Sequence, residues 1–211
     1  MSFLENTRRP DGIGGKMMVS LMNFGHRSLA EWGLRFVDPS ANASVLDCGC
    51  GGGANIAKLL AQCPAGMVMG IDYADISVQK SRKVNRRAIK KGRCAVLRAS
   101  VTELPFEDAR FDLVTAFETV YFWPGLTRCF CEVGRVLREN GTFLVCNECG
   151  GENAKDEKWT EKIDGMQIYT AAQLQAALEA AGFGSVCVHK NKKGWLCITA
   201  QKLPRADRTA E

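Results

Sequence analysis

The order of apolar and amphipathic segments along the chain predicts an α/β protein. Short apolar runs alternate with longer segments in which apolar residues recur every three or four positions. Such alternation is typical of strands that are connected by helices in a parallel sheet. The expected strands are 44–48, 67–72, 95–99, 113–117 and 142–147, and the expected helices are 54–63, 76–91, 125–138 and 171–181.

The C-terminal part of the chain predicts a helix followed by a hairpin. Thr170, with Gln173 three residues later, has the spacing of a capping box at a helix N-terminus. Gly182 is suited to end that helix. Apolar stretches at 185–190 and 195–201 then flank a short turn that contains glycine. Because a glycine turn between two such stretches is a hairpin signal, we expect a β-hairpin there.

The first forty residues lie outside this alternation. Residues 12–15 read Gly-Ile-Gly-Gly and are expected to be flexible, and two apolar stripes follow at 17–24 and 29–36. We interpret residues 1–40 as a cap of two short helices over the carboxyl ends of the strands, and residues 41–211 as the main domain. The alternative is a helix pair that only covers the surface of the sheet.

Composition agrees with one globular domain. The chain has 211 residues, of which 46% are hydrophobic and 24% are charged, and this is enough to form a core. It shows no secretion signal and no run of about 18 apolar residues, so we expect a cytoplasmic protein with no membrane partner. Ten cysteines would then be reduced thiols. Cys146 and Cys149 have the spacing of half a zinc site, but no second pair lies at a suitable distance, and we expect no metal.

The positive charge of the chain, +5, is clustered. Eight lysines and arginines between positions 80 and 93 follow one predicted helix and its end. Such a cluster is compatible with nucleic-acid binding. It equally fits the solvated face of a helix, whose C-terminal dipole favours cations, and no RNA-binding module is attached. We therefore expect no nucleic-acid partner.

A glycine-rich turn between a strand and a helix is the segment most informative about function. The strand ends near Asp47, glycines follow at 49, 51, 52 and 53, and a helical pattern begins at 54. An α/β sheet holds nucleotide-like ligands at such a turn, where glycine permits left-handed backbone angles and a close approach of the ligand. Asp47 would repel a pyrophosphate and attract an ammonium group, which S-adenosylmethionine carries.

A second acid supports a ribose-binding site. Asp72 ends the next strand, 23 residues after Gly49, and an acid at that place can accept hydrogen bonds from both ribose hydroxyls. Tyr73 follows it and could lie against an adenine. Three alternatives stay open: a dinucleotide site, because the glycine spacing also satisfies that looser fingerprint; a turn that binds no ligand; and an Asp72 that only serves the N-terminus of the next helix.

Four motifs occur in series along the chain. They are Asp47-x-Gly-x-Gly-x-Gly53, Gly70-Ile-Asp72, Leu104-Pro-Phe with Phe111-Asp-Leu-Val114, and Glu132-Val-Gly-Arg-Val-Leu137. In order and spacing this series, over about residues 43–147, resembles class I S-adenosylmethionine-dependent methyltransferases. A mild departure is Glu139-Asn140-Gly141, where the family commonly has Lys-Pro-Gly-Gly. The resemblance implies a Rossmann-like, doubly wound sheet of seven strands in the order 3-2-1-4-5-7-6, with an antiparallel last hairpin.

The resemblance also implies S-adenosylmethionine as the cofactor and assigns its contacts. It places the adenine near Ser100 and Val101, after the third strand, and the methionine half at Phe117. Many relatives have an acid near Ser100, which this chain lacks. The expected cofactor-binding residues are Asp47, Gly49, Cys50, Gly51, Asn55, Asp72, Tyr73, Ser100, Val101 and Phe117.

The segment after the fourth strand is rich in aromatic residues and borders the expected ligand crevice. Glu118, Tyr121 and Trp123 are expected to face the methyl acceptor. The candidates for a general base are Glu118, Tyr121 and His26. His26 also fits a plain turn residue, and Phe122 and Trp123 also fit anchors of the following helix.

These observations favour a methyltransferase that moves a methyl group to a small-molecule acceptor by in-line displacement, in which alignment supplies much of the rate. An RNA or protein methyltransferase and a non-catalytic nucleotide-binding module are the alternatives. Uptake of labelled methyl by RNA or protein would indicate the first, and ligand binding without turnover the second. The motifs specify neither the acceptor nor an oligomeric state.

Overall fold

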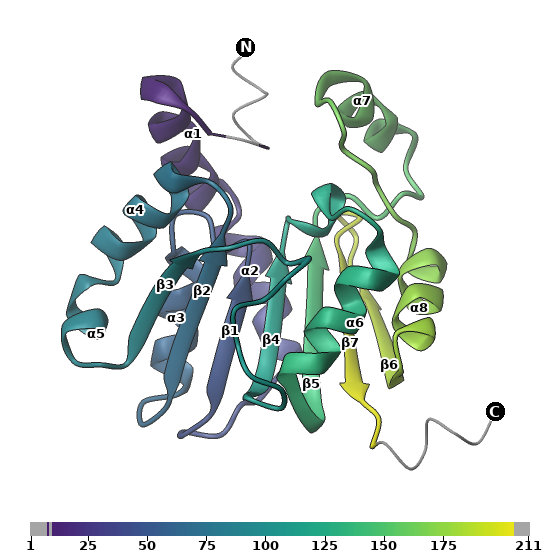
Figure 1. The fold of residues 1–211 in the computed structure, drawn as a ribbon. Coiled ribbons are helices and arrows are strands. Elements are labelled where there is room, and N and C mark those ends of the chain that lie inside the picture. Colours follow the sequence, from purple (N-terminus) through teal and green to yellow (C-terminus); the bar gives the residue numbers. More distant parts are fainter. Residues whose placement is uncertain (1–7, 9, 205–211) are drawn as a thin grey trace.

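Seven strands form one mixed sheet in the order β3-β2-β1-β4-β5-β7-β6 (Figure 1). The computed structural model describes residue 8 and residues 10–204. The strand order and the antiparallel pairing of β7 with β5 and β6 confirm the predicted fold. The strands are β1 (Ser44–Cys48), β2 (Met67–Asp72), β3 (Cys94–Arg98), β4 (Phe111–Phe117), β5 (Leu137–Asn147), β6 (Phe183–Lys190) and β7 (Leu196–Lys202).

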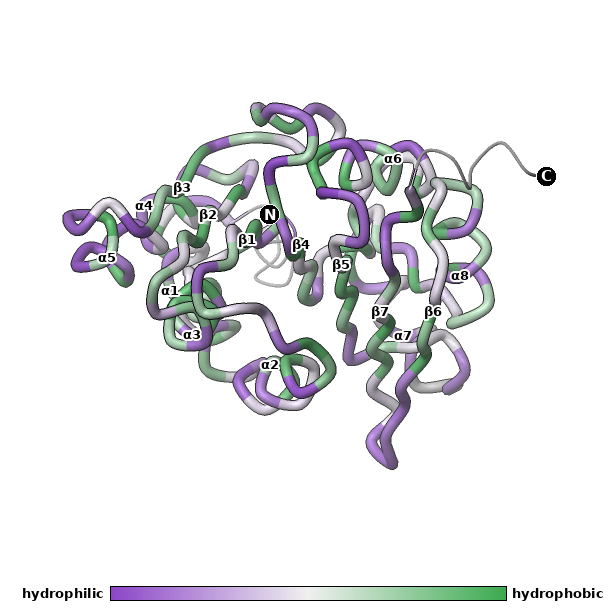
Figure 2. The backbone as a smooth tube through the Cα atoms, turned by 90° about the horizontal axis from the view of Figure 1, so that it is seen from below, coloured by the Kyte–Doolittle hydropathy of each residue, from purple (hydrophilic) through white to green (hydrophobic). Residues whose placement is uncertain are grey.

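Helices cover both faces of the sheet (Figure 2). On one face, α2, α3 and α4 pack through a core that includes Leu29, Ile56 and Val78. On the other face, α6 and α8 pack through a core that includes Val133 and Leu174. The α-helices are α1 (Gly12–Gly25), α2 (Arg27–Gly33), α3 (Ala54–Gln62), α4 (Asp75–Val84), α5 (Arg86–Lys90), α6 (Leu126–Val136), α7 (Ala154–Lys162) and α8 (Ala171–Ala180).

The direction of the strands decides where a ligand can bind. The five strands β1 to β5 are parallel, so their carboxyl ends lie at one edge of the sheet. The strand order reverses between β1 and β4, and open α/β sheets bind ligands in the crevice at such a switch point. Asp72 and Phe117, two of the expected cofactor contacts, end β2 and β4 at this edge.

The predicted start and end of α8 are confirmed. The hydroxyl of Thr170 accepts the N–H of Gln173 at 3.3 Å, and the N–H of Thr170 donates to the side chain of Gln173 at 2.9 Å, which completes the capping box. Gly182 follows the helix with a φ of 82°, a left-handed angle that glycine adopts without a steric cost. The hairpin of β6 and β7 then begins at Phe183.

The prediction of one helix over residues 76–91 is wrong, because α4 and α5 are separated at Asn85. The buried amide of Asn85 donates to the carbonyl oxygens of Ser81 at 3.1 Å and of Gly53 at 3.0 Å. An asparagine that bonds to nearby backbone competes with helix formation. Here the same bond also ties the end of α4 to the glycine-rich turn.

The N-terminal segment also differs from expectation. Residues 12–15 are not a flexible stretch but the first turn of α1, and Asp11 caps this turn by accepting the N–H of Gly12 at 2.8 Å. Of the two helices that were expected to lie over the strand ends, α2 instead packs against the face of the sheet, where the carbonyl oxygen of Leu29 lies 3.9 Å from the thiol of Cys146. Residues 1–7 and 9 of the expected cap, and 205–211 of the main domain, lie outside the described residues.

A helix that the sequence did not predict, α7, rises above the strand ends across from α1 (Figure 1). Six of its nine residues are charged, so it lacks the apolar stripe by which helices are recognised. Throughout the described part of the chain, no helix is both long enough and apolar enough to cross a bilayer.

Candidate active site

A cavity of about 880 Å³ lies at the carboxyl ends of the parallel strands. The glycine-rich turn and the residues after β2, β4 and β5 form its floor and walls. Met22 and Asn23 of α1 and Trp159 of α7 line it from the two helices that rise above the sheet. Nine of the ten expected cofactor contacts and all three candidate bases line this one cavity; the exception is Asp47.

The glycine-rich turn is shaped by backbone bonds and left-handed angles. The N–H groups of Gly49 and Cys50 both donate to the carbonyl oxygen of Ile71, at 2.9 and 2.8 Å. Gly49 and Gly51 have φ values of 74° and 49°. A Cβ on Gly49 would lie 2.2 Å from the hydroxyl of Thr119, whereas a Cβ on Gly51 would meet no heavy atom within 4 Å. Gly49 is therefore required for packing, and Gly51 leaves open space for a ligand.

Asp72 joins the turn to the end of β2. Its Oδ2 accepts the N–H of Gly51 at 2.9 Å and its Oδ1 accepts the N–H of Ala74 at 2.9 Å. This carboxyl group lines the cavity, as does Ser77, whose side chain is hydrogen-bonded to it as well. Burial raises the pKa of Asp72, and the two backbone bonds oppose that rise.

Asp47 lies behind the turn and not at its mouth, as the sequence analysis placed it. It is 1% exposed and does not line the cavity. Its Oδ1 accepts the hydroxyl of Thr115 at 2.7 Å, while Oδ2 has no hydrogen-bond partner among the described residues. Burial raises the pKa of Asp47 to about 7, and the nearby charge of Asp72 adds to the rise.

The expected adenine end of the cavity is more open. Tyr73 is 41% exposed and lines the cavity, as do Asn55, Ser100 and Val101. The hydroxyl of Ser100 is 2.8 Å from that of Thr102.

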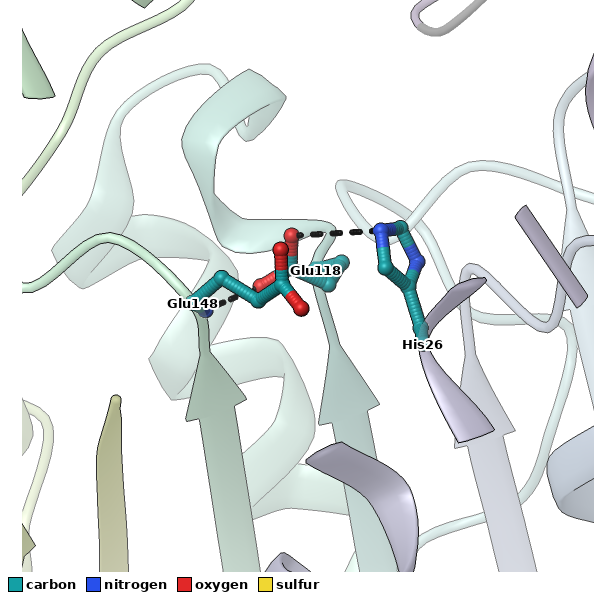
Figure 3. Close-up of side chains that lie close together, drawn as sticks. All are labelled: His26, Glu118 and Glu148. Carbon is teal, nitrogen blue, oxygen red and sulfur yellow. Dashed lines mark hydrogen bonds and ion pairs between the residues drawn. The ribbon is translucent and has the colours of Figure 1, made fainter. Parts of the chain in front are cut away.

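Glu118, directly after β4, is held in one orientation. Its backbone has a φ of 57°, which is uncommon for a residue with a side chain and costs energy. Oε1 accepts the N–H of Glu148 and, at 3.2 Å, the hydroxyl of Tyr121, while Oε2 lies 3.8 Å from Nε2 of His26 (Figure 3). Burial raises the pKa of Glu118 to about 8, and the neighbouring carboxylate of Glu148 adds to the rise.

Tyr121 and His26 hold the two sides of this carboxyl group. Tyr121 is 2% exposed, and its hydroxyl also accepts the N–H of Cys149 at 2.9 Å. Burial raises its pKa well above the usual value, and the charge of Glu118 adds to that rise. Burial lowers the pKa of His26, at the end of α1, while Glu148 opposes the decrease. Tyr121 is thus a hydrogen-bonded partner of Glu118, and His26 favours its neutral form.

Glu148 belongs to the same group, although the sequence analysis did not include it. It directly follows β5, the neighbour of β4, and lines the cavity. The signal that could have found it is its position, because the residues after adjacent parallel strands lie side by side.

Two aromatic residues after β4 have different surroundings. Trp123 is 7% exposed and stacks on Phe143 with ring centroids 6.2 Å apart, and its Nε1 donates to Thr119 at 3.2 Å. Phe122 is more exposed and lines the cavity. Trp123 also reaches the cavity wall, but its packing makes it mainly an anchor of the core.

The side chains of Cys146 and Cys149 do not lie together in one site. Cys146 is fully buried in the sheet opposite Cys197 of β7, whereas Cys149 is partly exposed and lines the cavity. Cys48 is fully buried and Cys50 nearly so. The cysteines of the glycine-rich turn are therefore small packing residues.

Comparison with known proteins identifies the family. Residues 46–145 match a family model described as a methyltransferase domain. Over these residues the chain carries a methyltransferase domain of the class I S-adenosylmethionine-dependent type. Two solved methyltransferases show the same fold. One, from Aquifex aeolicus, has a TM-score of 0.74 and 19% identity, and the likeness covers 89% of this chain and 98% of that one. The other, geranyl diphosphate C-methyltransferase of Streptomyces coelicolor, has a TM-score of 0.72 and 12% identity over 83% and 76%.

Curated methyltransferases match over part of their length. Cycloartenol-C-24-methyltransferase 1 of Oryza sativa is 30% identical over 118 residues, which is 56% of this chain and 34% of the relative. Sterol 4-C-methyltransferase of Caenorhabditis elegans is 28% identical over 182 residues, or 81% and 52%. The 27-O-demethylrifamycin SV methyltransferase of Amycolatopsis mediterranei is 30% identical over 148 residues, or 67% and 54%. The chain thus spans between about a third and about half of the length of these relatives.

The cofactor of this methyltransferase family fits the geometry. The turn leaves space beside Gly51, where a Cβ would meet nothing. Asp72 presents a carboxyl group to the cavity for the ribose, and the cavity wall near Asp72 carries no lysine or arginine that would favour a phosphate among the described residues. A cationic, phosphate-free ligand suits this environment.

Proposed function

We propose that this chain transfers a methyl group from S-adenosylmethionine to a small, uncharged and mostly apolar acceptor. The observation that carries the proposal is that one cavity joins the glycine-rich turn to the Glu118 group. A ligand on the turn and a second ligand at Glu118 would therefore meet in the same enclosed space. Alignment of two reactants in this way can supply several kcal/mol of the activation barrier.

The cofactor half of the cavity would use the residues around the turn. Asp72 would accept the ribose hydroxyls, Gly51 would leave room for the backbone to approach, and Phe117 would lie against the methionine half. Tyr73, Asn55, Ser100 and Val101 would surround the adenine, with Gly49 and Cys50 shaping the turn. When bound, S-adenosylmethionine supplies an electrophilic methyl group on a sulfonium ion.

The other half of the cavity suits an apolar acceptor without negative charge. Met22, Phe122, Trp159 and Ile163 give it apolar walls. Arg8, at the rim, is the one lysine or arginine among the described lining residues, and it pairs with Asp164. A carboxylate or phosphate acceptor would therefore find no unpaired cation among the described lining residues. The names of the curated relatives, which include sterol and rifamycin methyltransferases, agree with an apolar small molecule.

The Glu118 group would bind the reacting end of the acceptor and accept its proton. Oε2 of Glu118 and Nε2 of His26 are the two atoms placed to do so, because Oε1 is already occupied by the donors from Glu148 and Tyr121. Tyr121, whose hydroxyl is bonded on two sides, would position Glu118 rather than react.

The test is a labelled-methyl assay with purified protein and a fractionated extract of apolar metabolites. We expect label in organic-soluble products, loss of that label in Glu118→Gln, and full label in the control Glu179→Gln, an exposed acid on α8. Label in RNA or protein instead would replace the small-molecule acceptor with a macromolecule. Binding of S-adenosylmethionine without label in any pool would favour a non-catalytic module.

A further inference from the structure

Three metal-ligating side chains from three separate elements converge on the cavity wall (Figure 3). His26 follows α1, Glu118 follows β4 and Glu148 follows β5. One ligand atom from each lies within 4.8 Å of the other two. An ion with bonds of about 2.1 Å holds neighbouring ligand atoms roughly 3.0–3.4 Å apart. His26 and Glu118, at 3.8 Å, are already close to that spacing, and small side-chain rotations would complete the site.

The hydrogen bonds around Glu118 leave one of its carboxylate oxygens, Oε2, available to bind a metal ion. The hydroxyl of Tyr121 and the N–H of Glu148 hold Oε1, and Oε2 is left facing His26 and the cavity. Hydrogen bonds to a ligating carboxylate fix its orientation in known metal sites. The backbone of Glu118, with a φ of 57°, directs this carboxylate at some cost in energy.

The charges around the group also favour a cation. Among the residues that the structure describes, no lysine or arginine forms an ion pair with Glu118 or Glu148. His26 is the one partner with an ion-pair distance to Glu118. Two carboxylates side by side in a partly buried wall repel each other, and a dication between them would offset that repulsion.

We propose that His26, Glu118 and Glu148 bind one divalent first-row transition ion, of the type of Mn²⁺ or Fe²⁺. An imidazole together with two carboxylates suits these ions better than Mg²⁺ or Ca²⁺, which take oxygen ligands. All three side chains line the cavity, so the remaining coordination positions would face it. The inference rests on the proposed function in one respect: with the ion bound, an oxygen or nitrogen of the acceptor would bind the ion, which would then replace Oε2 of Glu118 and Nε2 of His26 as the group that the acceptor meets.

The experiment is a titration of tag-free, metal-free protein with Mn²⁺, in which the electron paramagnetic resonance signal of free Mn²⁺ is followed without cofactor or acceptor. Mn²⁺ is chosen because thiolates bind it weakly and the chain has ten cysteines. We expect one ion per chain. We expect affinity to decrease at least about tenfold in His26→Gln and in Glu148→Gln, since even changes around a ligand have effects of that size.

Each control variant makes the same kind of substitution at a residue outside the group of His26, Glu118 and Glu148. His189→Gln removes the other histidine of the chain, and Asp164→Asn removes a carboxylate that lines the same cavity. Both should bind Mn²⁺ as the unchanged protein does. Circular dichroism and thermal melting verify that each variant is folded.

Absence of binding at millimolar Mn²⁺, or equal affinity in all variants, would overturn the inference. The outcome is separable from that of the proposed function, because Mn²⁺ is titrated without methyl transfer. Methyl transfer that persists in the presence of a chelator, in protein that binds no Mn²⁺, would leave the proposed function intact and refute the ion site. Mn²⁺ binding in a protein that transfers no methyl group would support the ion site and contradict the proposed function.

Discussion

The backbone N–H of Gly51 donates to Oδ2 of Asp72 at 2.9 Å, so the glycine-rich turn is bonded to the end of the neighbouring strand. The glycine-rich turn and the end of β2, which are the two parts of the expected cofactor site, therefore hold each other in position. The carboxyl group that would bind the ribose also fixes the loop beside it. A change at either residue should affect both.

Replacing Asp72 should weaken cofactor binding by more than a lost ribose contact. In Asp72→Asn the N–H groups of Gly51 and Ala74 can no longer both face a carboxylate oxygen. Hydrogen bonds to charged groups contribute about 1.5–3 kcal/mol, which corresponds to a dissociation constant for S-adenosylmethionine about 10- to 100-fold higher. Calorimetric titration measures this. Asp75→Asn is the control, because Asp75 is 61% exposed and pairs with Arg98; equal affinities of the two variants would contradict the assignment.

Alanine substitutions at two glycines of the turn should affect different properties, cofactor affinity in one variant and stability in the other. Gly51→Ala places its methyl group in open space, so the protein should fold with a cost of about 1–2 kcal/mol from its left-handed angle, while cofactor affinity decreases. Gly49→Ala places its methyl group 2.2 Å from the hydroxyl of Thr119 and should mainly lower the melting temperature. Thermal melting and calorimetry of both variants separate the effects. Unchanged cofactor affinity in Gly51→Ala would place the ligand elsewhere.

Asp47 should make the free protein less stable as the pH rises. Its pKa in the folded state is about 7 because of burial, against a usual value of 3.8. The folded state therefore binds the extra proton, and the stability it contributes is complete below about pH 4 and is lost as the pH rises to about 7. Glu118, with a raised pKa of about 8, acts in the same direction.

The matching variant is Asp47→Asn, which imitates the protonated acid. Its free energy of unfolding in urea should decrease less between pH 5 and pH 8 than that of the unchanged protein, and the variant should be the more stable of the two at pH 8. An identical pH dependence in both proteins would show that Asp47 is ionised in the folded state.

The two aromatic residues after β4 should differ in what they support. Trp123→Ala removes a buried ring stacked on Phe143 and should reduce the free energy of unfolding by about 3–5 kcal/mol. Phe122→Ala should reduce it by about 1 kcal/mol and raise the KM for the acceptor, because Phe122 lines the cavity. Urea unfolding and initial rates measure both quantities. A larger stability loss for Phe122→Ala would reverse the roles.

Much of the fold follows from local sequence patterns. The strands β1 and β2 have the predicted bounds because each is a short apolar run with an acid at or next to its last residue, followed by a turn. The capping box at Thr170 is likewise decided by two residues in contact. The strand order needed the resemblance to a family, because pairing between distant strands is not encoded in any one segment.

The predictions that were wrong or incomplete concern segments whose structure depends on contacts with other parts of the chain. Asn85 interrupts the predicted helix because its side chain finds a partner in Gly53, which is distant in sequence. Residues 12–15 become helical although they are rich in glycine, because Asp11 caps them and Gly15 is buried against the rest of the molecule. Glu148 was overlooked because nothing in its own neighbourhood distinguishes it; only the adjacency of β4 and β5 brings it to Glu118.

The two helices above the strand ends have one further consequence. α1 precedes the first strand and α7 lies between β5 and α8, so neither interrupts the sheet or the glycine-rich turn. Insertions, deletions or exchanges in these two segments would leave the sheet intact while reshaping the walls on the acceptor side. A lineage with this architecture can therefore acquire new substrates by remodelling two peripheral stretches of chain.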